Sequence, residues 1–221
     1  MLISLHLPKT AGTSFRATLE THFGASLKPD YNDIPINRPA WKRNSLAFMN
    51  AMSLIFHDFS GTECIHGHFL PLKYRFLEMK MPLTYVTWLR HPVDRVISHY
   101  YFWKSHQPTV LPPLHARMIR EEWTLERFCL GPEMKDIYHQ FFWGFPLKKL
   151  SFIGITEYYV DDFAWFCKNF LGSETTGMML NKNSNSDQPA LSKSLRKAIE
   201  GYHEKDIALY SWALELRKQR L

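Results

Sequence analysis

The segment His6-Leu7-Pro8-Lys9-Thr10-Ala11-Gly12-Thr13-Ser14-Phe15 joins an apolar run to an amphipathic pattern near the start of the chain. Residues 2–7 are mostly apolar and end at Pro8, as expected of a buried strand. From there on, Phe15, Leu19 and Phe23 recur at the spacing of one helix face, with Thr13 or Ser14 as the expected N-cap. The sequence therefore predicts a strand, a short loop and a helix.

Small residues and hydroxyl groups dominate this loop. Backbone N–H groups beside small residues, at the positive end of a helix dipole, bind anions. A phosphate site is therefore predicted from the loop residues Lys9, Thr10, Ala11, Gly12, Thr13 and Ser14. Lys9 precedes Gly12, which differs from the GxxxxGK[ST] order of ATPases and GTPases. On local composition alone, a tight strand-to-helix turn with a solvated lysine is an equally good interpretation.

Composition bounds the class of protein. The 221 residues carry a formal net charge of +6 and 45% apolar residues, which indicates one globular domain over residues 1–221 with a basic surface that suits an anionic ligand. No apolar run approaches the roughly 20 residues that span a bilayer. Three widely spaced cysteines without a CxxC pair argue against a disulfide framework and a structural zinc site, and fit a reducing cytoplasm.

Predicted strands alternate with predicted helices along the chain, which is typical of an α/β fold with a mainly parallel central sheet flanked by helices. Strands are expected at 2–7, 63–68, 83–89 and 150–155. Helices are expected around 46–56, from residue 92, and around 125–130, 161–170, 192–202 and 204–217. Residues 105–123 and 181–188 are expected to be loops.

A second candidate anion site follows the strand at 83–89. Arg90 lies at its carboxyl end, where open α/β sheets present ligands, and Pro92 is expected at the first position of the next helix. Ser98 lies two turns into that helix. The planar guanidinium fork and one hydroxyl can hold a phosphate together. The alternative is a structural ion pair between Arg90 and Asp94.

Two histidines stand out among the eleven. His66 and His68 flank a glycine at a strand end, and residues two apart on a strand point to the same side. A histidine can accept a proton because its ordinary pKa, about 6.5, lies close to neutral pH. Metal ligation is the alternative, but the sequence offers no third ligand at suggestive spacing. Two polar residues at a strand end is the plainest interpretation.

These motifs share a family resemblance. PKTAGTS at 8–14, the RxPxxRxxSxYY pattern from Arg90 to Tyr101 and IHGHF at 65–69 resemble segments of sulfotransferases, especially the group of heparan sulfate 2-O-sulfotransferase and its bacterial relatives. The resemblance implies a three-layer fold like that of P-loop NTPases and 3′-phosphoadenosine 5′-phosphosulfate (PAPS) as sulfuryl donor, without a metal. It implies that Lys9 neutralises the bridging oxygen and that Arg90 and Ser98 hold the 3′-phosphate.

The same resemblance makes His68 the general base and His66 its supporting partner, with Glu63, His57 and His6 as the next candidates. Asn183 and Ser184 are expected in a segment over the nucleotide. The acceptor is expected to be a carbohydrate or small-molecule hydroxyl, bound by residues 25–62 and 104–148. A nucleic-acid partner and a membrane span are not expected. Because the chain starts at the first strand, it resembles a cytoplasmic bacterial enzyme or an excised catalytic domain.

Two other classes of function remain open at this point. A nucleotide or sugar kinase would also need a phosphate loop, although the order of Lys9 and Gly12 argues against it. A non-catalytic module that binds a nucleotide or polyanion would keep both anion sites and be indifferent to His68. The oligomeric state is not fixed by the sequence.

Overall fold

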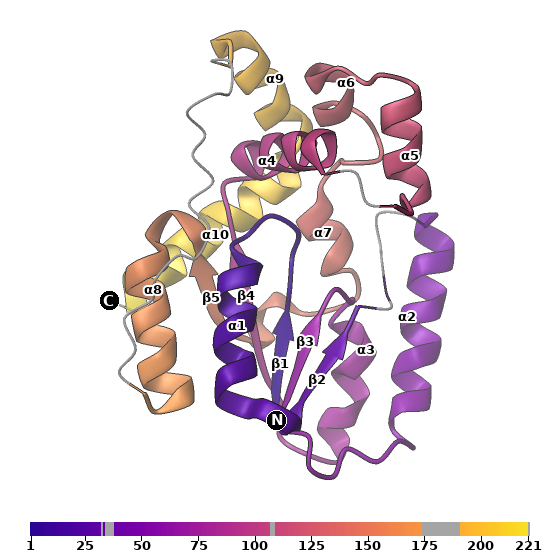
Figure 1. Cartoon of the computed structure of the whole chain (residues 1–221). Helices are drawn as coiled ribbons and strands as arrows, with labels where there is room; N and C mark the ends of the chain where they lie inside the picture. Colours follow the sequence, from indigo (N-terminus) through magenta and orange to yellow (C-terminus); the bar gives the residue numbers. More distant parts are fainter. Residues whose placement is uncertain (32, 34–37, 107–108, 174–190, 221) are drawn as a thin grey trace.

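A five-stranded, all-parallel sheet forms the centre of the computed structural model, which describes residues 1–31, 33, 38–106, 109–173 and 191–220. The sheet order is β2-β3-β1-β4-β5, so the chain crosses from one side of β1 to the other. The bounds are β1 (Leu2–Leu5), β2 (Leu27–Asp30), β3 (Cys64–Gly67), β4 (Thr84–Leu89) and β5 (Leu150–Ile155). The predicted α/β class is confirmed, and Figure 1 shows its layers.

Helices cover both faces of the sheet. The apolar residues of β1 alternate between them, since Leu2 packs with one core cluster and Ile3 and Leu5 with the other. The first cluster lies under α1 (Gly12–Phe23) and α8 (Tyr159–Phe166). The second lies under α3 (Leu72–Arg75), α7 (Ile137–Phe141) and α10 (Glu204–Arg220). The sheet is therefore buried on both faces, as in other doubly covered parallel sheets.

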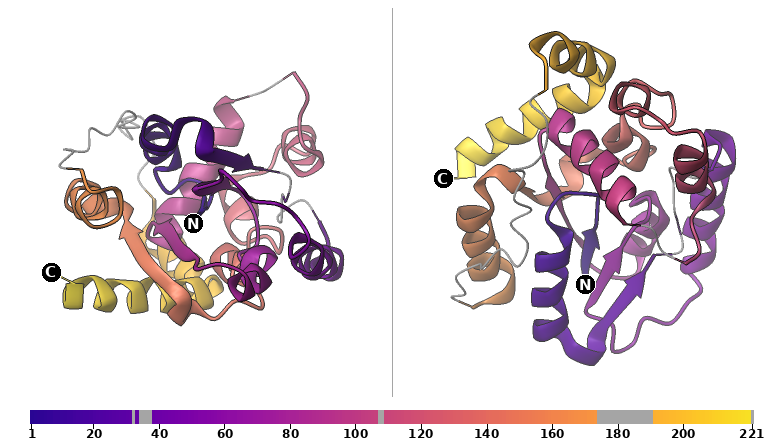
Figure 2. Two further views of the ribbon diagram at one scale, coloured as in Figure 1. Left: turned by 90° about the horizontal axis from the view of Figure 1, so that it is seen from below. Right: turned by 45° about the horizontal axis from the view of Figure 1, so that its top comes forward.

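A third group of helices lies beyond the carboxyl ends of the strands (Figures 1 and 2). It consists of α4 (Pro92–Ser105), α5 (Pro113–Arg120), α6 (Leu125–Cys129) and α9 (Lys193–Tyr202). These helices share their own apolar core around Val96, Trp103 and Phe128. The long helix α2 (Ala40–Leu54) lies beyond the β2 edge and packs on α3. This helical group therefore lies over the carboxyl edge of the sheet.

Short turns of helix complete the described chain. They are the 3-10 turns η1 (Gly24–Ser26), η3 (Phe76–Met79), η4 (Leu147–Lys149) and η5 (Thr156–Tyr158), and a π-helical turn at Cys167–Leu171 that continues α8. Among the described residues, no helix is long and apolar enough to cross a membrane.

The prolines caused most errors in the predicted elements. Strand β2 was not predicted because it contains Pro29, which an edge strand tolerates. Helix α5 lies inside the predicted loop at 105–123, where Pro112 is its N-cap and Pro113 its first residue. Helix α2 begins directly after Pro39, at Ala40 rather than near residue 46. In each case a proline that would be expected to interrupt regular structure instead lies in an edge strand or at the start of a helix.

Asp162 on α8 fixes the carboxyl end of β5 to the end of α10. Its carboxylate is fully buried and accepts the backbone N–H of Ile155 at 2.8 Å. The same carboxylate accepts the Nε–H of Arg217 at 2.7 Å and lies 2.7 Å from Nη2 of Arg220. Removing one partner from a buried charge cluster leaves the remaining charges without compensation.

We expect Asp162→Ala to lower the free energy of unfolding by about 3–5 kcal/mol, because two arginines lose their buried partner. Asp161→Ala is the matched control, since its carboxylate is exposed and lies 3.7 Å from Arg217. It should change stability by less than about 0.5 kcal/mol. Urea denaturation followed by circular dichroism measures both. Equal effects of the two substitutions would contradict this role of Asp162.

Candidate active site

The sequence motifs meet at the carboxyl edge of the sheet. Strands β3, β1 and β4 are neighbours, so the residues that follow them come together: His68 after β3, the loop 6–11 after β1, and Arg90 after β4. From β1 the chain runs to β2 at one end of the sheet, and from β4 to β5 at the other. Open parallel sheets bind ligands at such a reversal of strand order.

The loop between β1 and α1 is shaped to present backbone N–H groups. Lys9 and Ala11 adopt left-handed conformations, with φ of 68° and 62°. The Thr10 hydroxyl donates to the carbonyl of Leu7 at 2.9 Å and holds the turn closed. Backbone turns that alternate in this way make concave anion sites. The composition-based prediction of a phosphate loop therefore has a matching backbone geometry.

Helix α1 begins two or three residues earlier than predicted, and its N-cap residue makes no side-chain capping hydrogen bond. Ala11 is the N-cap, so the expected capping by Thr13 or Ser14 is wrong. The first turn contains no acidic residue. Its N–H groups and the helix dipole therefore remain available to an external anion. Ser14 is buried, and the side chain of Thr13 lies outside what the structure describes.

Gly12 is required by the side chain of His6. A Cβ atom on Gly12 would lie 1.7 Å from Nε2 of His6, far inside any allowed contact. The imidazole therefore packs directly against the backbone of the loop. Any larger residue at position 12 displaces either the ring or the loop.

Two cations converge beside this loop. The Lys9 ammonium lies 4.0 Å from the ring centroid of Phe102, which is one turn beyond the buried Ser98 on α4. Burial, together with the nearby charge of Arg90, lowers the pKa of Lys9. In the described part of the chain, neither Lys9 nor Arg90 forms an ion pair with a carboxylate. The alternative pairing of Arg90 with Asp94 is wrong, because Asp94 instead binds Arg196 at 2.6 Å.

The backbone of Arg90 is held by the hydroxyl of Tyr138. The hydroxyl accepts the Arg90 N–H at 3.0 Å and donates to the Arg90 carbonyl at 2.7 Å. Tyr138 is fully buried on α7. The N–H groups of Tyr138 and His139 both donate to Asp206 on α10 at 3.0 Å. Arg90 is thus positioned by helices that are distant in sequence, a contact that the sequence did not reveal.

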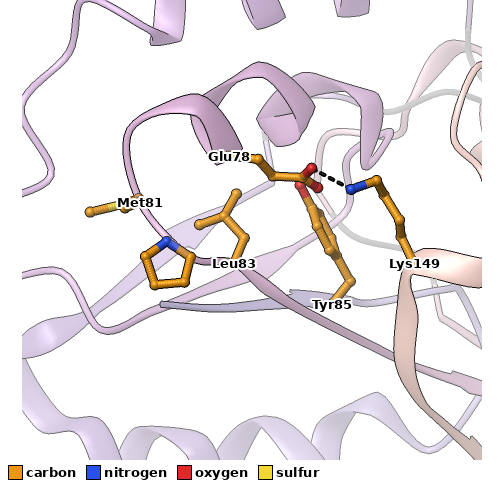
Figure 3. Close-up of a pocket in the computed structure, with 6 residues that line it drawn as sticks. Glu78, Met81, Leu83, Tyr85 and Lys149 are labelled. Atoms are coloured by element: carbon orange, nitrogen blue, oxygen red, sulfur yellow. Dashed lines mark hydrogen bonds and ion pairs between the residues drawn. The ribbon is translucent and has the colours of Figure 1, made fainter.

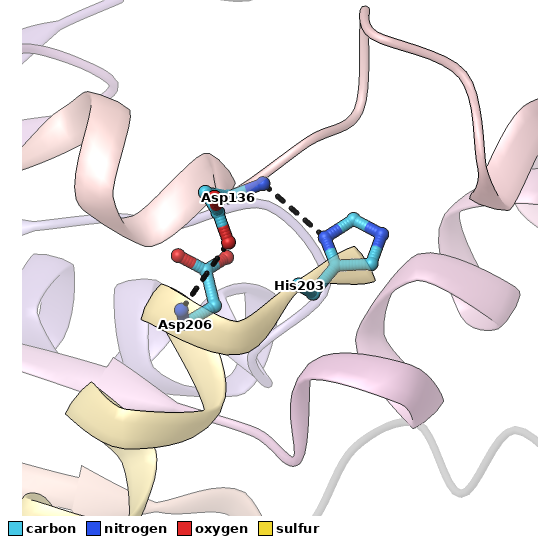
Figure 4. Close-up of side chains that lie close together, drawn as sticks. All are labelled: Asp136, His203 and Asp206. Carbon is cyan, nitrogen blue, oxygen red and sulfur yellow. Dashed lines mark hydrogen bonds between the residues drawn. The ribbon is translucent and has the colours of Figure 1, made fainter. Parts of the chain in front are cut away.

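Asp206 belongs to a buried cluster with Asp136 and His203 (Figure 4). Among the described residues this is the one group of acidic, histidine or cysteine side chains whose ligand atoms lie within 4.8 Å of one another. Nδ1 of His203 accepts the Asp136 N–H at 3.2 Å, and its Nε2–H donates to the carbonyl of Cys129 at 2.8 Å. Both ring nitrogens are therefore engaged. Burial raises the pKa of Asp206 to about 6. The cluster works as a hydrogen-bonded support for α7.

His68 is oriented by the backbone of β1. Its Nδ1 is hydrogen-bonded to the carbonyl oxygen of His6. A carbonyl only accepts, so Nδ1 carries the proton and Nε2 keeps its lone pair. Burial lowers the pKa of His68, so the imidazole is neutral at pH 7. This is the state that a general base needs before it accepts a proton.

His6 and His66 form a stack with His68. The ring of His6 lies 4.4 Å from that of His68 and 5.2 Å from that of His66, centroid to centroid. Nδ1 of His66 shares a hydrogen bond with the Ser4 hydroxyl at 2.8 Å, and burial lowers its pKa to about 3. Burial and the two neighbouring histidines also lower the pKa of His6. The site contains a third histidine, which the sequence analysis ranked only as a reserve base.

Tyr31, directly after β2, closes the side of this stack. Its hydroxyl lies 3.3 Å from Nδ1 of His6, and its ring meets that of His68 edge-on at 5.0 Å. The close approach of β2 also explains the glycine between the two histidines, since a Cβ on Gly67 would lie 1.7 Å from the carbonyl oxygen of Asp30. Tyr31 was missed because β2 itself was not predicted.

The remaining candidates lie elsewhere. Glu63 precedes β3 and accepts a hydrogen bond from Ser26 at 2.8 Å, which places it at the amino edge of the sheet. His57 is exposed and hydrogen-bonded to the carbonyl of Ser53 on α2. Asn183 and Ser184 lie outside the described residues, so their predicted role stays a prediction.

A pocket of about 240 Å³ also lies at the amino edge (Figure 3). It sits where β4 and β5 begin and contains the ion pair between Glu78 and Lys149, with an N–O distance of 2.5 Å. Because the motif residues follow the other ends of the strands, this pocket is not part of the candidate site.

Comparison with known proteins places the fold. No known family matches the sequence, and no curated protein shows significant sequence similarity to it. Among solved structures, a sulfotransferase from Alicyclobacillus acidocaldarius superposes on 96% of this chain and 94% of its own, with a TM-score of 0.51 and 14% sequence identity. The chain has the fold of a sulfotransferase. At this identity the likeness concerns the fold, and the chemistry must be argued from the residues.

The buried histidines should make the protein acid-labile. The pKa of His66 is lowered to about 3 and that of His203 to about 4, both by burial, whereas an unfolded histidine titrates at about 6.5. Stability is complete above pH 6.5 and declines below it, because only the unfolded chain then binds these protons.

From these two residues alone, we expect the free energy of unfolding to decrease by about 2.4 kcal/mol between pH 6 and pH 5, and Asp206, whose pKa burial raises to about 6, opposes part of this decrease. Urea denaturation at half-unit pH intervals measures the slope. His66→Asn should reduce this decrease by about 1.2 kcal/mol. An unfolding free energy that is constant from pH 7 to pH 5 would show that these rings are protonated in the folded state.

Proposed function

We propose that the chain transfers the sulfuryl group of PAPS to an acceptor hydroxyl, with His68 as general base. One observation carries this proposal: a neutral histidine with a free Nε2 lies beside a backbone anion loop and two cations that lack a carboxylate partner in the described chain. A proton acceptor and an anion site are the two parts that sulfuryl transfer requires.

The residues fit a donor with phosphate groups at two positions. The loop 9–14 and the uncapped N-terminus of α1 suit the 5′-phosphosulfate, because they offer N–H groups and no competing carboxylate. Arg90 and Ser98 suit the 3′-phosphate, in line with the resemblance of their motif to the sulfotransferase pattern. Tyr138 fixes the backbone from which the Arg90 side chain extends.

PAPS supplies an electrophilic sulfur and a phosphate leaving group, and the chain supplies the proton acceptor and the positive charge. Nε2 of His68 takes the proton from the acceptor hydroxyl as the new O–S bond forms. Lys9 neutralises the charge that develops on the bridging oxygen as the old S–O bond breaks. The carbonyl of His6 keeps the base in the required tautomer, and the product leaves as 3′,5′-bisphosphoadenosine.

The acceptor that we propose is a carbohydrate hydroxyl. The likeness of the segment 65–69 to 2-O-sulfotransferases favours it. Tyr31 adds an aromatic ring beside the histidine stack, and the guanidinium of Arg16 lies 5.3 Å from its centroid. An aromatic face next to a cation suits a sugar ring that carries anionic groups.

The first test concerns the donor. At 100 times its dissociation constant, 3′,5′-bisphosphoadenosine should stabilise the protein by about 2.7 kcal/mol, which raises Tm by roughly 5–10 °C. AMP and ATP should do much less, since both lack the 3′-phosphate. Arg90→Ala should abolish the difference between the bisphosphate and AMP in a thermal-shift assay. Equal shifts with all three nucleotides in the unmodified protein would refute the 3′-phosphate site, and a preference for ATP would favour a kinase.

The second test separates the roles of Lys9 and His68. We expect His68→Ala to lower kcat by about 10²–10⁴-fold and to leave the affinity for the bisphosphate unchanged. Lys9→Ala should lower kcat by about 10²–10³-fold and reduce the affinity for the bisphosphate modestly. Because burial lowers the pKa of His68, kcat should stay level from pH 8 to about 6.5 and decline only below it. The rate at which labelled product forms with a carbohydrate acceptor measures kcat for each variant and its dependence on pH. His57→Ala, which alters an exposed histidine, is the control. Full activity of His68→Ala would move the base to another group.

A further inference from the structure

Helix α2 carries an apolar stripe on its outer side. Trp41, Phe48, Met49, Met52 and Phe56, here called the α2 stripe, are all at least 47% exposed. The first four lie on α2, and at 100° per residue their positions fall within about one third of its circumference, whereas Phe56 lies two residues beyond its last residue, Leu54. Arg43, Ala47 and Ala51 lie on the opposite side and are buried. The inner side of α2 packs on α3 and η3, and Figure 1 shows the helix at the margin of the molecule.

This stripe is at the upper end of the apolar patches found on monomeric proteins. Side chains of this size have about 200 Å² of surface each, so these exposed fractions leave roughly 600 Å² of apolar side chain in water. Phe76 on η3 meets Phe48 edge-on at 6.2 Å and extends the apolar area toward the exposed Met79. Contiguous patches of this size mark interaction sites.

The charges around the α2 stripe favour a second copy of this chain over a membrane as the partner. Between Ala40 and Phe56 the sequence contains no acidic residue and two basic ones, Lys42 and Arg43. Arg43 points inward and donates to Gln140 at 2.7 Å. The stripe itself is uncharged, so a second copy related by a two-fold axis meets it without like-charge repulsion. A helix that lies on a membrane would instead flank its apolar face with several cations.

The area is also that of a dimer interface. Pairing two stripes removes roughly 1,200 Å² from water, the lower bound of stable specific interfaces. Helix α2 is about 22 Å long at 1.5 Å per residue. Antiparallel pairing then places Trp41 of each copy beside the Phe56 end of the other, with Met49 near the axis. We propose that the α2 stripe is the interface of a two-fold symmetric homodimer.

Sedimentation velocity of the full chain tests this proposal. Between 1 and 100 µM the protein should sediment as a dimer of two 26.1 kDa chains. The double variant Phe48→Glu and Met52→Glu should raise the dimer dissociation constant at least about 100-fold, because each copy places two charges in an apolar contact. Val160→Glu is the control, since Val160 is exposed on α8 and lies outside the stripe. It should leave the dimer intact.

Cross-linking tests the geometry independently. Cys64, Cys129 and Cys167 are all buried, so an added surface cysteine is the reactive thiol of the described chain. Met49→Cys should form an intermolecular disulfide under mild oxidation, whereas Val160→Cys should not. A monomer at 100 µM, or a dimer that persists in the double glutamate variant, would overturn the proposal. Binding of a monomer to anionic vesicles through the stripe would overturn it too. None of these results depends on sulfuryl transfer.

Discussion

The contact between the His6 ring and the bare Cα of Gly12 connects the two halves of the candidate site. On one side of the ring lies the loop whose left-handed residues, Lys9 and Ala11, turn N–H groups outward. The same ring stacks on that of His68, whose Nδ1 is hydrogen-bonded to the carbonyl of His6 itself. One residue, directly after β1, thereby contacts both the candidate anion loop and the candidate base. The loop cannot shift without moving the ring against which the base is stacked.

In the described chain, no carboxylate pairs with the positive charges of Lys9 and Arg90. Burial, and after it the nearby charge of Arg90, lowers the pKa of Lys9, and an incoming anion would relieve this repulsion. The support comes from buried groups on α7 and α10. Asp206 binds two N–H groups of α7, and Tyr138 on that helix binds the backbone of Arg90. These buried acidic groups therefore support α7 without pairing with Lys9 or Arg90 in the described chain.

The sequence predicted the parts of this arrangement that depend on local pattern. The alternation of strands and helices, the loop after β1 and the position of Arg90 after β4 all follow from periodicity and from residue types at strand ends. Pro92 at the start of α4 was expected for the same reason and is found there. The prediction of α1 placed its cap wrongly, because Thr13 and Ser14 are good capping residues and the left-handed turn at Ala11 has no local signature.

What the sequence did not predict depends on contacts between distant segments. Tyr138 reaches Arg90 across 48 positions, and the Asp206 network spans 67 or more. The role of His6 could have been predicted from the sequence, because a residue that follows a central strand lies beside the end of the neighbouring strand in the sheet. Its neighbour His68 follows the paired strand β3, whose Gly67 is in register with Leu5. Tyr31 could not have been predicted as a site residue, because Pro29 argued against a strand at β2, the element that positions Tyr31.

The most direct measurement of the central claim is the transfer of radiolabelled sulfate from PAPS to a panel of glycan, phenol and lipid acceptors. The account predicts label on at least one hydroxyl acceptor, most strongly on a carbohydrate, and background transfer when both Lys9 and His68 are replaced by alanine. A protein that binds 3′,5′-bisphosphoadenosine but transfers no label to any acceptor would contradict it, and would identify the carboxyl edge of the sheet as a binding site without catalysis.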